Sequence, residues 1–349
     1  GLGATGMVGQ RFIQQLQDHP EFKIEALAAS ERSAGKRFGE AVEWVLETEI
    51  KPELKEIEVC TATVEGVESS GKLDVIFSAL PASVAAQVEP EFAQAFPVFT
   101  NAGAFRREPD VAILIPEINP DHLEILEKQR RERGWKGFIV TNANCTTTGL
   151  VLPLKAIMDE FGLEEVRMVS MQAVSGAGYR GSAAVSGMQI IDNVIPYIGG
   201  EEEKVQYEAR KILGGLKDGE FKPASFRLDV SCNRVPVLDG HTECVFVETK
   251  EECDPDRARE VMSNFTGQPQ KLKLHSAPTR PIWVLEEENR PQPRFDRMIE
   301  GGMAMAVGRI RRGSTKKSLL YVSCVHNNIR GSAGGSVLNA ELARAMGYL

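Results

Sequence analysis

The sequence has 349 residues, of which 42% are hydrophobic and 26% are charged, and its formal net charge is −8. This composition is that of an ordinary globular protein, and the length favours two domains. The acidic balance argues against nucleic-acid binding, which needs a basic face. Short basic runs at 309–312 and 316–317 are interpreted as a solvated turn and strand end. The sequence contains no run of about 18 apolar residues, so no membrane span is expected.

Residues 1–9 read GLGATGMVG and contain the pattern G-x-G-x-x-G. Apolar residues at helical spacing follow, from Val8 to Leu16, and His19-Pro20 ends the predicted helix. Such glycines allow a tight turn in which backbone N–H groups approach a pyrophosphate at a helix N-terminus. The strand that normally enters this loop is expected to precede Gly1, outside the sequence. The nucleotide contacts predicted in this segment are Gly3, Thr5, Gly6, Met7 and Val8.

Strands and helices then alternate, which predicts an α/β fold with a Rossmann-type, doubly wound parallel sheet. Its strands are expected at 22–29, 73–79, 97–100, 111–115 and 138–141, with a helix near 84–95. Beyond residue 165, longer strands at 166–174, 226–237, 243–248 and 319–325 predict an α+β domain with a mostly antiparallel sheet. The closing helix, 332–349, is expected to pack back on the first domain. The predicted domains are therefore 1–144 plus 330–349, which binds the cofactor, and 145–329, which is catalytic and forms the dimer.

The choice of cofactor depends on the end of the strand at 22–29. The sequence continues with Ser30, Glu31, Arg32 and Ser33 in place of a lone acidic residue. Arg32, with Ser30 and Ser33, could bind the 2′-phosphate of NADP, whereas Glu31 could hold the ribose of NAD. We expect NADP. At the end of the next strand, Ala79 and Leu80 are further candidate cofactor contacts.

Cys145 lies between the end of a strand and the start of a helix, in NANCTTTG. Backbone N–H groups at such a position stabilise a thiolate and a developing oxyanion, and Thr146 or Thr147 could cap the helix. A buried, inert cysteine is the ordinary alternative, but the strand–NANC–helix order favours a nucleophile. Pro153 is expected to kink or loosen this helix.

The other cysteines carry no such signal. None of the six forms a C-x-x-C pair, so we expect free thiols in a reducing cytoplasm, and no metal site is visible. Cys232, Cys244 and Cys324 lie in β-like runs and are expected to be buried as small apolar residues.

A thiolate needs a proton-transfer partner, and His241 is the best placed of the five histidines. It lies at a turn between two predicted strands, directly after Gly240 and seven residues after Arg234. An ordinary turn histidine is the alternative, and spacing alone leaves both open.

Five separated segments together resemble aspartate-semialdehyde dehydrogenase, and most closely its archaeal and fungal branch. The segments are NANCTTTGL, SMQAVSGAGY, PYIGGEEEK, CNRVPVLDGHTE and VHNNIRGSAGG, and they follow one another in the family's order over essentially the whole chain. The resemblance implies that Cys145 forms the acyl intermediate, that His241 is the acid/base histidine and that Gln172 orients the substrate beside the thiol.

The resemblance also implies a set of binding residues. Arg234 would hold the substrate carboxylate, Glu201 the amine, and Lys204 and Arg106 the phosphate. Which glutamate of 201–203 contacts the amine is left open. The implied contacts near the nicotinamide are Ser175, Gly176 and Asn327.

The implied reaction is the reversible, NADP-dependent reductive dephosphorylation of L-aspartyl-4-phosphate to L-aspartate-4-semialdehyde through a cysteine thioester. It belongs to lysine, threonine and methionine biosynthesis, and the implied assembly is a homodimer or a homotetramer. A malonyl-CoA or succinyl-CoA reductase on the same scaffold is one alternative, but it has less need of Arg234. N-acetyl-glutamyl-phosphate reductase is a weaker one, because its residues around the cysteine and histidine differ. A non-catalytic NADP-binding regulator would have no use for Cys145, Gln172, Arg234 and His241 together.

Overall fold

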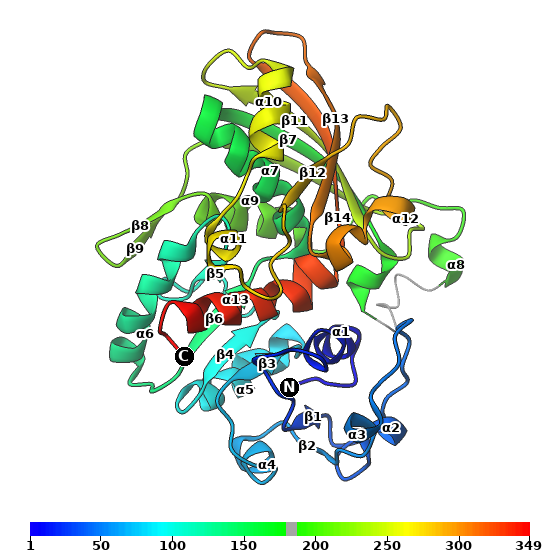
Figure 1. Cartoon of the computed structure of the whole chain (residues 1–349), viewed down its shortest axis with the longest axis vertical. Helices are drawn as coiled ribbons and strands as arrows, with labels where there is room; N and C mark the ends of the chain where they lie inside the picture. Colours follow the sequence, from blue (N-terminus) through cyan, green and yellow to red (C-terminus); the bar gives the residue numbers. More distant parts are fainter. Residues whose placement is uncertain (179–186) are drawn as a thin grey trace.

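The computed structural model describes residues 1–178 and 187–349. The chain forms two parts, each around its own sheet, and the C-terminal helix α13 (Gly334–Ala345) lies between them (Figure 1). Tyr179, the last residue of one of the motifs above, lies outside the described residues. No helix in the described part of the chain is long and apolar enough to cross a membrane.

The first part contains short parallel strands, as the alternating pattern predicted. One pair, β1–β2, and one four-stranded sheet, ordered β3-β4-β6-β5, are joined by Leu2, which bridges to both Ala28 and Ser78. The strands are β1 (Leu27–Ala29), β2 (Val59–Thr61), β3 (Ile76–Ser78), β4 (Pro97–Thr100), β5 (Ile113–Leu114) and β6 (Phe138–Asn142). The strand predicted over 22–29 is regular only at its end, because among the described residues no strand pairs with its first half.

Helices lie on both sides of these strands (Figure 1). The glycine loop leads into α1 (Met7–Leu16), and the helix predicted near 84–95 is α5 (Ala82–Ala93). The other helices of this part are α2 (Phe38–Ala41), α3 (Pro52–Lys55), α4 (Val64–Glu68), η1 (Pro120–Glu124) and α6 (Ile125–Arg133).

Helix α13 contributes to the core of the first part. Val337 and Leu342 belong to the same apolar cluster as Phe12, Phe77 and Phe99. This contact is the one expected of a closing helix that returns to the first domain. The exact domain boundaries stay a prediction, because Ile113 and Ala143 pack in the core of the second part.

The second part is built on a six-stranded mixed sheet ordered β10-β7-β11-β14-β13-β12. Three of its neighbouring pairs are antiparallel, while β10–β7 and β12–β13 are parallel, so the prediction of a mostly antiparallel sheet is confirmed. Its strands are β7 (Leu163–Gln172), β10 (Arg227–Arg234), β11 (His241–Thr249), β12 (Ile282–Val284), β13 (Met305–Arg312) and β14 (Ser318–Val325). The sequence did not predict β12 or β13, the second because its arginine-rich end resembles a solvated turn.

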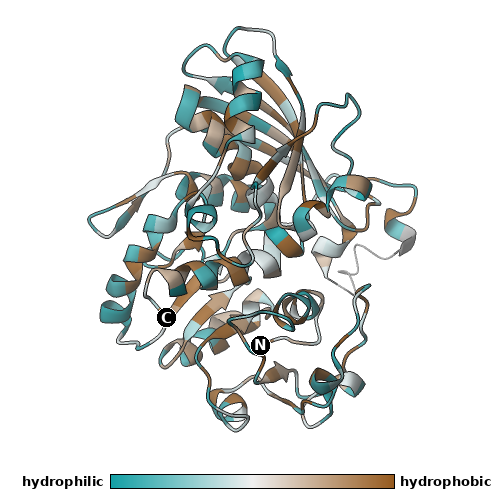
Figure 2. Ribbon diagram, viewed as in Figure 1, coloured by the Kyte–Doolittle hydropathy of each residue, from teal (hydrophilic) through white to brown (hydrophobic). Residues whose placement is uncertain are grey.

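One face of this sheet is covered by helices and the other is open. Its apolar core includes Val245, Val247 and Leu319, and the strands appear brown in Figure 2. The covering helices are α7 (Cys145–Phe161), α9 (Glu201–Ile212) and α10 (Pro255–Ser263). The remaining elements are α8 (Gly187–Ile190), the β8 (Gly215–Lys217) and β9 (Glu220–Lys222) hairpin, α11 (Gln268–Leu272) and α12 (Pro293–Asp296), with 3-10 turns η2 (Val174–Ala177) and η4 (Ile299–Gly302) and a π-helical turn η5 (Ile329–Ala333).

Helix α7 runs without interruption through Pro153. Proline has no N–H to donate to the carbonyl four residues earlier, which is that of Gly149. The hydroxyl of Ser323 donates to this carbonyl instead, at 3.4 Å. A side chain of β14 thus replaces the missing backbone bond, so the helix that the sequence predicted to kink or loosen keeps its helical assignment.

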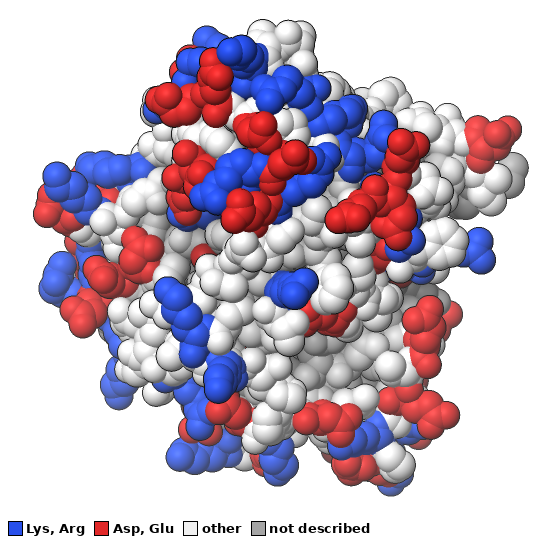
Figure 3. Space-filling view, turned by 45° about the horizontal axis from the view of Figure 1, so that its top comes forward, with Lys and Arg blue, Asp and Glu red and all other residues white. Residues whose placement is uncertain are grey.

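The basic run 309–312 lies at the end of β13, the run 316–317 lies in the turn before β14, and both have acidic side chains nearby. Lys316 lies 3.4 Å from Glu252, and Arg312 lies 3.6 Å from Asp254. Figure 3 shows the same intermixing of charges at the top of the molecule. This arrangement agrees with the solvated turn expected from the sequence.

Candidate active site

The start of α7 is capped by Asn144, the residue before Cys145. Its Oδ1 accepts hydrogen bonds from the backbone N–H groups of Thr146 at 2.9 Å and Thr147 at 3.1 Å. The expectation that Thr146 or Thr147 caps this helix is therefore wrong. The sequence also predicted that backbone N–H groups at the start of this helix hold an oxyanion. The N–H groups of Thr146 and Thr147 are not free to do so, because both donate to Asn144.

Cys145 and His241 come together although they are 96 residues apart. Sγ of Cys145 lies 3.1 Å from Nε2 of His241, the first residue of β11. Gly240 permits the turn before this strand through its positive φ of 99°. The backbone N–H of Ala173 donates to Nδ1 of His241 at 3.0 Å. Because Nδ1 accepts, a neutral ring carries its hydrogen on Nε2 and points it at the sulfur.

Burial shifts both members of this pair towards their neutral forms. It raises the pKa of the Cys145 thiol to about 12, and the carboxylate of Glu201 adds to the rise. Burial, with the charge of Arg234, lowers the pKa of His241 well below its ordinary value. Arg234, Arg106 and the N–H of Thr146 act in the opposite direction on the thiol but do not outweigh burial. These shifts favour the protonated thiol, whereas the sequence predicted a thiolate stabilised by the helix start.

Arg234 and Gln172 occupy neighbouring positions at the ends of two parallel strands. They pair in register across β10 and β7, and both are buried. Nη1 of Arg234 donates to the carbonyl of Ala173 at 2.7 Å, and Nε2 of Gln172 donates to Ser170 Oγ at 3.2 Å. A Cβ on Gly176 would lie 3.0 Å from Nη1 of Arg234 and 3.1 Å from Cε1 of His241. The η2 turn therefore passes directly over the arginine and the histidine.

Helix α9 faces the cap of α7 with Glu201. One oxygen of Glu201 accepts from Nδ2 of Asn144 at 2.8 Å, and the other lies 3.5 Å from Nζ of Lys204. Glu202 instead accepts from the backbone N–H of Cys232 at 3.0 Å, and Glu203 is exposed. Of the three glutamates that the sequence left open, Glu201 is the one beside the Cys145 segment.

Arg106 reaches the same place from the loop after β4. It is buried, and its Nη2 donates to the carbonyl of Asn101 at 2.9 Å. Its Nη1 donates to Oε1 of Glu208 on α9, also at 2.9 Å, while the other oxygen of Glu208 accepts from the backbone N–H of Asn144 at 2.7 Å. Sequence reasoning missed Glu208, because no motif relates it to Arg106, 102 residues earlier.

The glycine loop has the shape that a pyrophosphate site requires. Gly3 has a φ of 75°, and a Cβ on Gly9 would lie 2.1 Å from the carbonyl oxygen of Gly3. Gly6 begins α1 without any side-chain cap, so the first N–H groups of the helix are not taken by one. Thr5, Met7 and Val8 are half-buried around this turn. These residues fit a dinucleotide.

The other candidate cofactor residues lie around this loop and near His241. The carbonyl of Ala79, followed by Leu80, would lie 2.8 Å from a Cβ on Gly3. Ser30, Arg32 and Ser33 form the turn after β1, where Ser30 and Arg32 are exposed.

Ser175 and Asn327 belong to a network beside His241. Nδ2 of Asn327 donates to Oγ of Ser175 at 3.0 Å, and its Oδ1 accepts from the N–H of Gly240 at 2.9 Å. Ser175 donates in turn to Asp239 at 2.7 Å, and Asp239 lies 3.7 Å from Arg11 of α1. Asp239, which the sequence did not single out despite its place in the DGH segment, thus joins the cofactor helix to the turn that carries His241.

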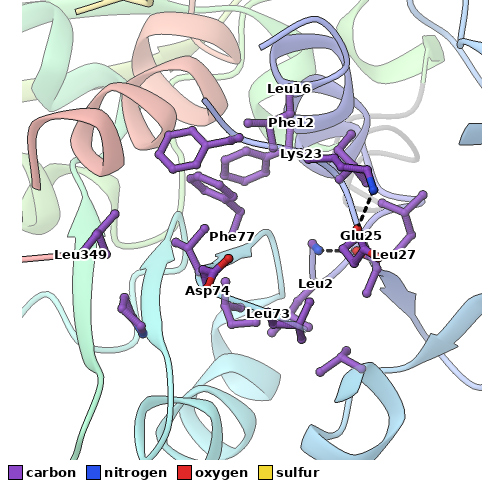
Figure 4. Close-up of a pocket in the computed structure, with 18 of the residues that line it drawn as sticks. Leu2, Phe12, Leu16, Lys23, Glu25, Leu27, Leu73, Asp74, Phe77 and Leu349 are labelled. Atoms are coloured by element: carbon purple, nitrogen blue, oxygen red, sulfur yellow. Dashed lines mark hydrogen bonds and ion pairs between the residues drawn. The ribbon is translucent and has the colours of Figure 1, made fainter. Parts of the chain in front are cut away.

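A cavity of about 700 Å³ adjoins the glycine loop, whose Leu2, Ala4 and Gly9 help to line it, but not Cys145 and His241 (Figure 4). It is formed mainly by residues 21–27 and 72–77, with Phe12 and Leu16 of α1, and is largely apolar. None of the candidate site residues lines it. The candidate active site is therefore defined by the convergence of α7, α9, β7, β10 and β11, and not by this cavity.

Comparisons with known proteins agree with this site. A family model described as the semialdehyde dehydrogenase NAD-binding domain matches residues 2–126, and one described as the semialdehyde dehydrogenase dimerisation domain matches residues 154–330. Aspartate-semialdehyde dehydrogenase of Methanothermobacter thermautotrophicus is 55% identical over 342 residues, covering 98% of this chain and 97% of that protein.

Two solved structures share the fold over the whole chain. That of the Candida albicans aspartate-semialdehyde dehydrogenase with NADP has a TM-score of 0.89 at 40% identity, covering 100% of this chain and 98% of that one. That of the Vibrio cholerae aspartate-semialdehyde dehydrogenase II, complexed with ASA, has a TM-score of 0.78 at 26% identity and the same coverage.

Proposed function

The chain belongs to the aspartate-semialdehyde dehydrogenase family, and on that premise we propose how its residues interconvert L-aspartyl-4-phosphate and L-aspartate-4-semialdehyde with NADP. The observation that carries the proposal is the contact of 3.1 Å between Cys145 and His241, beside the buried Arg234. A nucleophile, a hydrogen-bond donor and a cation for a carboxylate are the groups that covalent oxidation of an amino-acid aldehyde requires.

In the dehydrogenase direction, the sulfur of Cys145 bonds to the aldehyde carbon after its thiol proton has left to solvent. The adduct is a thiohemiacetal whose oxygen carries the negative charge. Nε2–H of His241 faces this position, so we assign it the role of donor to that oxygen. The sequence suggested that His241 accepts the hydroxyl proton, but the N–H of Ala173 favours the tautomer that donates at Nε2.

The adduct carbon then loses a hydride and becomes the thioester of Cys145. NADP, when bound, supplies the hydride acceptor. Gly3, Gly6 and the start of α1 would hold its pyrophosphate, Ser175 and Asn327 its nicotinamide end, and Arg32 with Ser30 and Ser33 its 2′-phosphate. The relative from Candida albicans supports this choice, because its structure contains NADP.

Phosphate attacks the thioester carbon in the last step, and the sulfur leaves as the acyl phosphate forms. Arg106 and Lys204 are the two cations that we assign to phosphate, which carries close to two negative charges. Arg234 suits the planar α-carboxylate, and Glu201 suits the α-ammonium group. Gln172 lies next to Arg234 in register and would orient the substrate.

A CoA-ester reductase on this scaffold is the second candidate function. It would share Cys145 and the thioester but would need neither a carboxylate-binding arginine nor two cations for inorganic phosphate. The buried Arg106 and Arg234, both of which act electrostatically on the Cys145 thiol, favour the phosphate reaction.

The open face of the second sheet supports a proposal of self-association. Val169 of β7 is 40% exposed and Phe246 of β11 is 44% exposed, and both project from the side opposite α7. We propose a homodimer, alone or within a homotetramer, in which two copies cover each other's sheet face by two-fold symmetry. The family model that matches residues 154–330 is described as a dimerisation domain, which supports this assignment.

The test is phosphate-dependent reduction of NADP⁺ with L-aspartate-4-semialdehyde, run beside malonyl-CoA with NADPH. We expect turnover that requires phosphate and none with the CoA ester. Cys145→Ser should lose nearly all turnover, because serine is a far weaker nucleophile, yet bind NADP as tightly as the wild type by titration. Turnover with the CoA ester alone would show that the substrate is a CoA ester. Substantial activity of Cys145→Ser would show that Cys145 is not the nucleophile.

A further inference from the structure

Helix α9 places four ionisable side chains along the face that packs against the active-site loops. They recur at helical spacing, and three of them are buried: Glu201, Lys204, Glu208 and Lys211, of which Lys204 is exposed. Glu201 contacts Asn144, while Lys211 donates to the backbone carbonyls of Arg106, Glu108 and Val111 at 2.8–3.0 Å. The helix therefore grips both the nucleophile segment and the loop that carries Arg106.

Glu208 is the only one of the four whose side chain contacts both segments, among the residues that the structure describes. Its Oε1 lies 2.9 Å from Nη1 of Arg106, and its Oε2 accepts from the backbone N–H of Asn144 at 2.7 Å. The side chain of Glu208 is 2% exposed and that of Arg106 is 9% exposed. One buried carboxylate thus joins the peptide that enters Cys145 to the cation that we assign to phosphate.

Burying the Glu208 carboxylate beside a phosphate subsite costs free energy, which suggests that this side chain has a specific role. A negative charge beside a phosphate subsite repels the substrate, and both partners lose hydration on burial. Arg106 keeps N–H groups to spare, because its five N–H groups make only two hydrogen bonds among the described residues, to Glu208 and to the carbonyl of Asn101. Glu208 therefore anchors one edge of the guanidinium and leaves another edge for an anion.

We propose that Glu208 is a positioning residue that holds the phosphate subsite and the Cys145 sulfur at a fixed separation. Phosphate must approach the carbonyl carbon of the thioester on that sulfur from one face of the carbonyl group, and such bimolecular steps are highly sensitive to the distance between the reacting atoms. This inference rests on the proposed phosphate-dependent reaction.

The test compares Glu208→Gln with Glu203→Gln, an exposed glutamate on the same helix that undergoes the same change of charge. In Glu208→Gln an amide N–H₂ replaces one acceptor and must face either Arg106 or the N–H of Asn144, both of which are donors. We expect the KM for phosphate to rise and kcat to fall, each by about 10-fold or more, with the KM for NADP unchanged. We also expect a slower burst of NADPH without phosphate, which reports thioester formation.

A double variant separates the two contacts of Glu208. In an Arg106→Ala background, Glu208→Gln should no longer change the KM for phosphate but should still slow the burst. Glu208→Asp keeps the negative charge on a shorter side chain. If Glu208→Gln does not fold, the KM for phosphate and the NADPH burst are measured with Glu208→Asp instead.

A folded Glu208 variant with wild-type burst and wild-type KM for phosphate would overturn the proposal, as would a fully additive effect on the KM for phosphate in the Arg106→Ala background. A wild-type enzyme that does not oxidise the semialdehyde in this assay would refute the proposed function instead, so the two failures are distinguishable.

Discussion

At the scale of single residues, the hydrogen bond from Ala173 to His241 decides how the histidine works. A ring that accepts at Nδ1 is neutral and donates at Nε2, and burial with Arg234 opposes any added proton. Cys145 faces that donor at 3.1 Å. Burial and the Ala173 contact therefore favour a neutral thiol beside a neutral imidazole over a thiolate–imidazolium pair.

This tautomer predicts a ranking of His241 variants. Glutamine can present an N–H near the position of Nε2, whereas alanine cannot. We expect His241→Ala to lower kcat by about 10²–10³-fold, as for loss of an oxyanion donor, and His241→Gln to lower it clearly less. The measurement is kcat of both variants with saturating substrates. Equal losses would show that His241 must accept a proton, as the sequence first suggested.

The raised pKa of Cys145 predicts how its reactivity depends on pH. A thiol whose pKa is raised to about 12 is mostly protonated at neutral pH, so its thiolate fraction rises about tenfold per pH unit up to that value. Alkylation of Cys145 by iodoacetamide in the free enzyme should therefore accelerate continuously from pH 6 to pH 10. Peptide mass spectrometry separates it from the other cysteines. A rate that levels off below pH 8 would contradict the prediction.

At this scale, the sequence predicted the residues that lie in motifs but not the residues that contact them. Cys145 and His241 were found because their surroundings are distinctive along the chain, and the structure brings them together. Glu208 was missed because it acts through contacts with segments 64 or more residues away. Asn144 was assigned no role, although its cap of α7 is a local contact with Thr146 and Thr147. A local pattern specifies which residue is present but not which distant side chain meets it.

At the scale of elements, the predicted strands were found in place but with different lengths. Strand β4 has the predicted bounds, whereas β1 is limited to its last three residues by the lack of a pairing partner. The hydrophobic pattern reports burial, and residues 22–26 contribute apolar side chains to cores and to the cavity without regular pairing. Pairing is a property of two segments, so one sequence pattern does not determine it.

The glycine loop yields a prediction at this scale. In Gly9→Ala the added methyl would lie 2.1 Å from the carbonyl oxygen of Gly3, so the loop and the start of α1 must separate. NADP affinity should fall by at least about 10-fold, or about 1.4 kcal/mol. Gly215→Ala is the matched control, because a Cβ there meets nothing within 4 Å. Calorimetric titration with NADP measures both, and unchanged affinity of Gly9→Ala would refute a role of this packing in cofactor binding.

At the scale of the whole molecule, buried polar contacts tie the two parts together across the active site. Arg11 of α1 lies 3.7 Å from Asp239, two residues before His241. Glu341 of α13 accepts from the backbone N–H of Ser276, at 3.1 Å, and lies 2.6 Å from His19. The cofactor helix and the closing helix are thus both joined to the second part, so the loop and the catalytic histidine are held in one frame. Composition and periodicity indicated two domains but not these links.

The open sheet face leads to the last prediction, which concerns assembly. Exposed apolar side chains on the side of the sheet opposite α7, such as Val169 and Phe246, are costly in water, and a second copy would cover them without obstructing Cys145. Phe246→Asp places a charge on this face and should shift the protein from dimer to monomer in sedimentation velocity at micromolar concentration. Val84→Asp is the control, because Val84 of α5 is 40% exposed but lies on the first part.

Strand β11 begins at His241, and its inner face packs on α7. The effect of Phe246→Asp on the active site can therefore be measured separately from its effect on dimerisation. If the sheet alone holds His241 against Cys145, monomeric Phe246→Asp should keep the rate of Cys145 alkylation within about twofold, since its contact lies in the same chain. A monomer with a strongly altered alkylation rate would show that the second copy supports the strand that carries the histidine. A Phe246→Asp protein that sediments as a dimer would place the interface on another face.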